Sequence, residues 1–232
     1  MSPPGIEPGS HPRQGCILAV GLWAHVSEGK NRYILNLSFP FKFMDYSKEL
    51  ELIKSTEICK TCKNIVYGKG NFNSKIIFVG EAPGKNEDEQ GIPFVGAAGK
   101  NLDNLLEKVG LSLNDIYITN ILKCRPPENR NPSPEEIKMH TPYLIKQIKD
   151  MKPEVICSLG NYATKFFLAD CNPEKMDKQP GITTLHGKVR SLEIDGMKIK
   201  LIPLFHPAAI IYNQKLKIEW EKDMEIVKKE VF

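Results

Sequence analysis

Residues that can do chemistry follow the apolar run Lys75–Gly80, where a buried strand is expected to end. The turn behind this run, Gly80-Glu81-Ala82-Pro83-Gly84, fixes the backbone with glycine and proline, and Glu87-Asp88 follow it. A second turn, Gly91–Gly96, carries the ring of Phe94. These segments offer acids, an aromatic ring and free backbone N–H groups to a ligand. Open α/β sheets build their sites in this way, at the carboxyl end of a strand, although a glycine-rich turn alone is a weak signal.

The second candidate is Asn120, which ends the run Ile116-Tyr117-Ile118-Thr119-Asn120. A neutral amide donates through its NH2 group and accepts through its oxygen at the same time. One fixed amide can therefore distinguish ligands whose donors and acceptors are exchanged. The alternative is an ordinary turn asparagine that caps a loop, and without further context that alternative is favoured.

An aromatic ring and an imidazole complete the set. Phe94 lies between rigid residues in Pro93-Phe94-Val95-Gly96, where a core phenylalanine is the usual outcome and a stacking platform is the functional one. His206 precedes Pro207 at the end of another apolar run. A single histidine is more often structural than catalytic. At a strand end, however, it can donate a hydrogen bond to an oxygen on which negative charge develops.

The cysteines indicate a metal or cluster rather than disulfides. Cys59-Lys60-Thr61-Cys62 is a close pair, and Cys124 lies far from it in the sequence. Such a pair can bind zinc, do redox chemistry or arise by coincidence. The uneven spacing of the six cysteines does not match a secreted disulfide framework, so a reducing cytoplasm is expected. Cys157 is interpreted as a core residue of a strand.

Strands and helices alternate along the chain and would position these residues. Short apolar runs predict four buried strands, at Lys75–Gly80, Asp115–Ile121, Glu154–Gly160 and Lys198–Phe205. Helical patterns separate them, so the fold class is α/β with a parallel sheet covered on both faces. In such a sheet Gly80, Asn120 and His206 all follow carboxyl ends of strands, and we expect them to meet in one crevice.

Local signals define several of the connecting elements. Leu102, Leu105, Leu106 and Val109 recur at helical spacing and give one apolar face to a helix over Gly99–Val109. Ser133-Pro134-Glu135-Glu136 is a capping box with proline at the first helical position. Asp195-Gly196 predicts a two-residue hairpin turn before the last strand.

The segment from Gly80 to Gly96 resembles the first signature of the family 4 uracil-DNA glycosylases, which reads GEAPG, ED and GxPFVG. The His206-Pro207-Ala208-Ala209-Ile210 segment resembles the family's second signature, and Thr119–Pro127 resembles its Asn-to-Cys segment. The similarity runs from about Met44 to the C-terminus. It implies a three-layer α/β/α fold with a central, mainly parallel four-stranded sheet.

The resemblance also implies an activity, the hydrolysis of the bond between uracil and deoxyribose in DNA during base excision repair. Asn120 would pair with uracil O4 and N3–H, Phe94 would stack on the base, and His206 would polarise O2. The base must leave the helix because the target carbon cannot be reached inside a stack. The uracil-binding residues would be Gly80, Glu81, Ala82, Phe94, Asn120 and His206.

The group that orients the attacking water is open at this point. Position 82 is alanine, and family 4 lacks the carboxylate that the wider superfamily carries near it. Glu81 and Glu87 are therefore candidates for orienting the water or for bracing the loop. Either can also simply cap the following helix.

The family resemblance implies a 4Fe-4S cluster held by Cys59, Cys62, Cys124 and a fourth cysteine sixteen positions further on. In this chain that position is His140. Imidazole can ligate cluster iron, as Rieske centres show. Because His140 is three residues from Ile137 on an expected helix, a packed core histidine is the equally weighted alternative.

Length, composition and charge set wider limits. A chain of 232 residues with 41% hydrophobic and 26% charged residues suits one globular domain. The net charge of +4 is too small to argue for nucleic-acid binding. We expect a monomer in a prokaryotic cytoplasm that acts on single- or double-stranded uracil-containing DNA, with no membrane span.

Residues 44–232 form the expected glycosylase domain. Residues 1–43 would be an upstream extension before a natural start at Met44, or else a poorly ordered tail.

Two other functional classes remain possible from the sequence. One is a protein of the same fold that binds or senses uracil in DNA but turns over weakly, which the missing carboxylate and the altered fourth ligand suggest. The other is an iron–sulfur electron-transfer protein on a flavodoxin-like sheet. The second leaves Asn120 and His206 without a role.

Overall fold

The computed structural model describes residues 17–19, 22–24 and 46–231. The chain divides into two compact units, Met1–Met44 and Asp45–Phe232. In the first unit β1 (Ile17–Ala19) pairs antiparallel with β2 (Leu22–Ala24). The other residues of the expected extension lie outside the described residues, so its role stays a prediction.

The second unit is built on a six-stranded sheet with the order β3-β5-β4-β6-β8-β7. The strands are β3 (Lys69–Gly70), β4 (Ile76–Gly80), β5 (Tyr117–Asn120), β6 (Val155–Leu159), β7 (Arg190–Ile194) and β8 (Met197–Leu204). The four middle strands are parallel, and both edge strands are antiparallel to their neighbours. The four predicted strands are thus confirmed as the parallel core. The sheet itself is larger than the four strands expected, since β7 and the two-residue β3 extend it.

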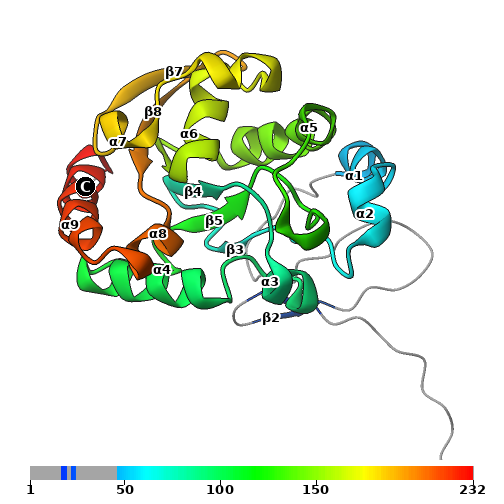
Figure 1. Ribbon diagram of the computed structural model, residues 1–232, viewed down its shortest axis with the longest axis horizontal. Coiled ribbons are helices and arrows are strands. Elements are labelled where there is room, and N and C mark those ends of the chain that lie inside the picture. Colours follow the sequence, from blue (N-terminus) through cyan, green and yellow to red (C-terminus); the bar gives the residue numbers. More distant parts are fainter. Residues whose placement is uncertain (1–16, 20–21, 25–45, 232) are drawn as a thin grey trace, which may run out of the picture. The chain divides into compact units, whose positions relative to one another are not determined.

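Helices cover both faces of this sheet (Figure 1). Their bounds are α1 Ser47–Lys54, α2 Glu57–Thr61, α3 Lys85–Gln90, α4 Ala97–Lys108, α5 Pro134–Met151, α6 Gly160–Leu168, α7 Ile182–Leu185, α8 Pro207–Tyr212 and α9 Lys215–Val231, with 3-10 turns at Pro127–Asn129 and Pro173–Lys178. None of the helices in the described ranges is long and apolar enough to cross a membrane.

Two apolar cores lie on the two faces, and strand alternation assigns residues to them. In β4, Ile77 and Val79 pack with α1, α2, α5 and α6, whereas Ile76 and Phe78 pack with α4, α8 and α9. Figure 1 shows α5 and α6 on one side of the sheet and α4, α8 and α9 on the other. Since successive side chains of a strand point to opposite faces, a strand buried on both sides is expected to be mainly apolar on both. The result is the three-layer α/β/α arrangement.

Local signals in the sequence account for the ends of several elements. Ser133 Oγ accepts from Glu136 N at 3.2 Å and Glu136 Oε2 accepts from Ser133 N at 2.8 Å, so the capping box starts α5 as predicted. Ile194 pairs with Met197 across Asp195 and Gly196, which both have positive φ. That geometry is the one expected of a two-residue hairpin turn.

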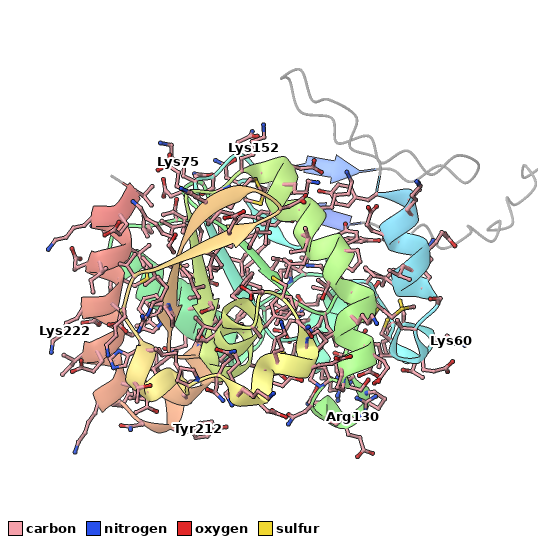
Figure 2. All side chains as sticks on the ribbon, turned by 90° about the horizontal axis from the view of Figure 1, so that it is seen from above. Lys60, Lys75, Arg130, Lys152, Tyr212 and Lys222 are labelled. Carbon is pink, nitrogen blue, oxygen red and sulfur yellow. The ribbon has the colours of Figure 1, made fainter. Side chains whose placement is uncertain are left out.

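The amino and carboxyl ends of the parallel strands lie at opposite ends of this unit. Lys75 and Lys152 precede the amino ends of β4 and β6, and Figure 2 shows them at the opposite end of the molecule from Arg130 and Tyr212. Tyr212 ends α8, just beyond the carboxyl end of β8, and its side chain is 89% exposed. The carboxyl ends of the parallel strands, where Gly80, Asn120 and His206 were expected to meet, therefore lie at the end of this unit that carries Arg130 and Tyr212.

Residues 1–43 are predicted to be dispensable for folding of the second unit. All strands of the six-stranded sheet lie beyond Met44, so a chain that starts at Met44 should unfold at the same temperature as the full chain. Thermal unfolding of both chains, followed by circular dichroism, checks this. Loss of soluble protein after the truncation would show that the segment is structural.

Candidate active site

Four adjacent parallel strands bring the candidate residues to one edge of the sheet. Gly80 ends β4 directly beside Asn120, which ends β5. On the other side of β4, β6 runs into Gly160, and β8 is followed by Phe205 and His206. The expectation that these strand ends converge is met by the strand order β5-β4-β6-β8.

Gly80 lies at the meeting point of the asparagine and the aromatic ring. A Cβ atom at position 80 would overlap with Asn120 Oδ1 and would lie 2.8 Å from Phe94 Cζ. The Phe94 ring is also 5.9 Å from the His206 ring, centroid to centroid, at an interplanar angle of 34°. Any side chain at position 80 would collide with Asn120 and Phe94, so the close approach of these two groups requires glycine here.

The amide of Asn120 is buried and has an unused acceptor. Its residue is 2% exposed, and Oδ1 has no hydrogen-bond partner among the described residues. Leaving a buried polar atom unpaired costs about 1–3 kcal/mol. Such an atom therefore needs an explanation, and a ligand that donates a hydrogen bond to it provides one.

A buried lysine that sequence reasoning missed supports Asn120 from behind. Lys123 is completely buried, and its Nζ donates to Thr119 Oγ1 at 2.6 Å and to the Asn120 carbonyl oxygen at 2.7 Å. Burial lowers the pKa of Lys123 well below its usual value. Thr119 Oγ1 in turn donates to the Tyr67 carbonyl oxygen at 2.7 Å. The strand end that carries the unpaired amide is thus held by a polar network.

His206 is fixed as a neutral donor by its own helix. Its Nδ1 accepts from Ala208 N at 3.2 Å as the N-cap of α8. Burial lowers the pKa of His206 to about 4. With Nδ1 accepting and the ring neutral, the proton resides on Nε2, which can donate to a ligand. Gly160, with φ of +86°, lets the chain pass close behind the ring, since a Cβ there would lie 2.9 Å from His206 Cβ.

The two glutamates play different parts. Glu87 Oε1 accepts from Val95 N at 2.9 Å and from Gly96 N at 2.8 Å, which agrees with the bracing alternative for this residue. Glu81 is half-buried, and burial raises the pKa of its carboxyl group. Its backbone is held because its carbonyl accepts from Leu122 N at 3.0 Å. Glu81 therefore lies directly after the carboxyl end of β4, and its carboxylate, unlike that of Glu87, does not bind the backbone of the loop.

Ala82 follows Glu81 and packs against the core cluster on the α5–α6 face. A methyl group there leaves no polar side chain at this position.

Three cysteines form a second cluster beside this edge. The Sγ atoms of Cys59, Cys62 and Cys124 lie within 4.8 Å of one another. The pKa of Cys59 is lowered to about 4 because its sulfur accepts hydrogen bonds from the thiols of Cys124, which has the larger effect, and of Cys62. Thiolates are the form that binds metals, so the three residues can hold a metal or an iron–sulfur group.

His140 is not among these clustered atoms. It is fully buried in α5, and its Nδ1 accepts from Lys123 N at 2.9 Å while Nε2 lies 3.5 Å from Thr56 Oγ1. Burial lowers the pKa of His140 to about 3. This environment agrees with the core-histidine alternative, and ligation by His140 stays a prediction.

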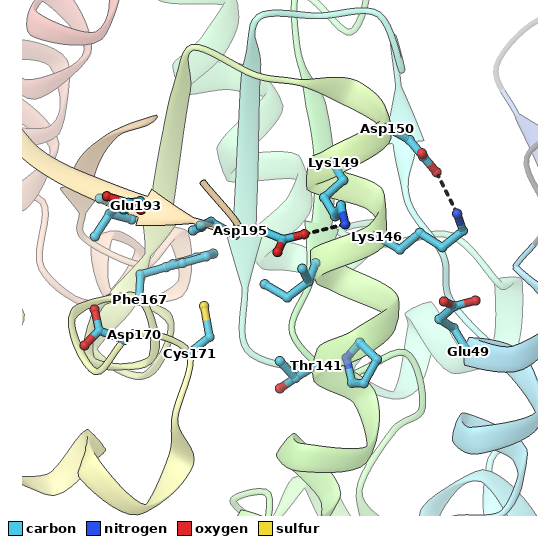
Figure 3. Close-up of a pocket in the computed structure, with 14 residues that line it drawn as sticks. Glu49, Thr141, Lys146, Lys149, Asp150, Phe167, Asp170, Cys171, Glu193 and Asp195 are labelled. Atoms are coloured by element: carbon cyan, nitrogen blue, oxygen red, sulfur yellow. Dashed lines mark ion pairs between the residues drawn. The ribbon is translucent and has the colours of Figure 1, made fainter. Parts of the chain in front are cut away.

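A pocket elsewhere on the molecule does not contain any of the candidate residues. It has a volume of about 590 Å³ and lies between α5 and the β7–β8 hairpin (Figure 3). Two ion pairs lie among its lining residues: Lys149 pairs with Asp195, and Lys146 with Asp150 at 3.5 Å. The volume of a pocket therefore does not identify the candidate active site in this fold.

Comparison with known proteins gives one consistent family. The model of the uracil DNA glycosylase superfamily matches residues 67–226. The chain is 43% identical to a type-4 uracil-DNA glycosylase of Archaeoglobus fulgidus over 181 residues, which is 78% of this chain and 89% of the relative. It is 41% identical to a type-4 enzyme of Saccharolobus solfataricus (78% and 82%) and 42% identical to one of Thermotoga maritima (72% and 85%).

Proposed function

The chain belongs to the uracil-DNA glycosylase superfamily and, within it, to the type 4 enzymes, and we propose that Asn120, Phe94 and His206 bind and release the uracil that it removes from DNA. The observation that carries this assignment is the buried, unpaired Oδ1 of Asn120 beside Gly80 and Phe94. Uracil offers N3–H to that oxygen and O4 to the amide NH2 group. Cytosine presents the reverse pattern at these positions, so the same amide rejects it.

Stacking supplies the second part of base recognition. The base leaves the DNA stack to reach the strand ends, and the Phe94 ring replaces part of the stacking that it loses. A base–aromatic contact of this kind contributes about 1–3 kcal/mol. Because Asn120 and Phe94 are only 2% and 6% exposed, a base that reaches them is removed from water, where mismatched hydrogen bonds cost most.

His206 stabilises the leaving group. Water adds to the sugar carbon C1′, the bond from C1′ to uracil N1 breaks, and its electron pair leaves with the base. Negative charge then spreads onto O2, to which the Nε2–H of His206 donates. Uracil takes up a proton, and an abasic site remains in the DNA.

Glu81 is assigned the orientation of the water. It follows Gly80 directly, and no side-chain hydrogen bond of Glu81 occurs among the described residues, so its carboxylate is left for a water. Glu87 is engaged with two backbone amides and braces the loop instead.

Cys59, Cys62 and Cys124 would hold the cofactor, a 4Fe-4S cluster. Three thiols in contact fit a soft metal group. When bound, such a cluster would join α2 to the segment behind Asn120. Because hydrolysis transfers no electron, its role there would be structural.

Iron content tests the ligand set. Changing Cys59 to serine should remove most of the iron and the broad visible absorbance, because a hard hydroxyl replaces a thiolate. His140→Gln should keep both if the three cysteines hold the cluster and His140 is a core residue. Loss of iron from His140→Gln at an unchanged unfolding midpoint would make it the fourth ligand.

An oligonucleotide assay tests the function. Purified full-length protein is incubated with single- and double-stranded oligonucleotides that carry one uracil, and abasic sites are revealed by alkaline cleavage on a gel. We expect cleavage at the uracil and none in matched oligonucleotides with cytosine or thymine. Retention of uracil DNA without cleavage would instead indicate a binding or sensing protein.

A further inference from the structure

The backbone of Phe94 has an unusual conformation. Its φ is +52°, in the left-handed region that non-glycine residues rarely adopt. Helix α4 packs directly on this residue, since a Cβ at Gly99 would overlap with the Phe94 carbonyl group. Conformations of this kind persist only where the surroundings hold them. The backbone of Phe94 therefore needs neighbouring groups that stabilise it.

Two opposite charges hold the peptide unit between Phe94 and Val95. Lys69 Nζ donates to the Phe94 carbonyl oxygen at 2.9 Å. Glu87 Oε1 accepts from Val95 N, the other end of the same peptide unit, at 2.9 Å. The ammonium group faces the negative end of this peptide dipole and the carboxylate faces its positive end. Rotation of the peptide would break both charge-assisted bonds.

Lys69 is an unexpected residue for this position. It lies in the short edge strand β3, opposite Ile118 of β5, and is only 8% exposed. Its one ion pair among the described residues is with Asp103, at 3.6 Å. Burying an ammonium group is costly unless hydrogen bonds and an opposite charge compensate. The hydrogen bond to the Phe94 carbonyl oxygen is shorter than the ion pair with Asp103, so it is the main interaction that compensates the burial of Lys69.

We propose that Lys69 is a positioning residue for the uracil-stacking ring: it acts through the Phe94 carbonyl to keep the left-handed backbone that lays the ring beside Gly80 and Asn120. This inference rests on the proposed stacking role of Phe94. Lys69 itself touches neither the base nor the reacting atoms. Its effect on catalysis must therefore pass through Phe94.

A double-mutant cycle tests that dependence. The variants are Lys69→Met, Phe94→Ala and the pair, all in the full chain, and the readouts are the single-turnover rate of uracil release and the affinity for uracil-containing DNA. We expect Lys69→Met to slow release about tenfold, the effect of losing one charge-assisted hydrogen bond. In the Phe94→Ala background the same change should alter the rate by less than about twofold, because the ring is already absent. In the variants that keep the Phe94 ring, DNA affinity should stay within about twofold of that of the parent chain, because it rests mainly on phosphate contacts.

Controls separate positioning from general stability. Lys75→Met removes an exposed lysine that pairs with Glu154 at the amino end of β4, and it should leave the rate unchanged. Lys69→Arg keeps a donor and should retain most of the rate. If Lys69→Met does not fold, Lys69→Gln, which is shorter but polar, takes its place in the cycle.

The outcomes are distinct. Equal losses from Lys69→Met with and without the Phe94 ring would overturn the inference and leave the stacking role intact. An unchanged rate in both Lys69→Met and Lys69→Gln would also overturn it. An unchanged rate in Phe94→Ala would contradict the stacking role itself, and with it this inference.

Discussion

Replacing Asn120 by aspartate is expected to slow uracil release by about a hundredfold or more under single-turnover conditions. The carboxylate cannot donate to O4, and a bidentate base contact of this kind is worth about 1–3 kcal/mol. The added negative charge lies in a site where the residue is 2% exposed, so it also opposes the anion that leaves. Both effects act against the transition state.

The measurement needs saturating enzyme and a matched control. Asn114→Asp makes the same chemical change at an exposed loop position before β5 and should leave the rate unchanged. Unfolding midpoints of both variants show whether the fold persists. An unchanged rate for Asn120→Asp at saturating enzyme would remove this residue from base reading.

The parallel core of the fold could be predicted because its strands are buried on both faces. Such strands are nearly continuous apolar runs, as in Ile76–Val79 and, with one buried serine, Val155–Leu159, and glycine or a polar residue marks their ends. The carboxyl ends of neighbouring parallel strands must then meet. The sequence therefore placed Gly80, Asn120 and His206 together without any knowledge of side-chain contacts.

The supporting residues could not be found in this way. Lys69 and Lys123 are lysines, a residue type that is almost always exposed, and only tertiary structure shows that both are buried. β3 has two residues, too few for any periodic pattern. The division of labour between Glu81 and Glu87 depends on which backbone amides Glu87 reaches across the loop. The residues around Glu81 and Glu87 in the sequence do not indicate whether those contacts form, so the two roles could not be told apart from the sequence.

His206→Ala is expected to reduce the single-turnover rate of uracil release by about a hundredfold or more, the usual loss for one donor to a developing oxyanion. The bond from Nε2–H to O2 strengthens as the glycosidic bond breaks, so its removal acts on the rate. Affinity for DNA rests mainly on phosphate contacts and should stay nearly constant. A parallel fall in rate and affinity would indicate a structural or DNA-docking residue.

The pH dependence distinguishes a neutral from a charged donor. Because the pKa of His206 is lowered to about 4, the ring stays neutral from pH 8 down to about pH 5, and it should cause no inflection near the ordinary histidine value of about 6.5. Glu81 must be ionised to orient water, and burial raises its pKa. An acid limb in the rate profile should therefore belong to Glu81 and vanish in Glu81→Gln. An inflection near pH 6.5 that persists in Glu81→Gln and disappears in His206→Ala would assign leaving-group stabilisation to a charged imidazolium, against the hydrogen bond that Nδ1 accepts from Ala208.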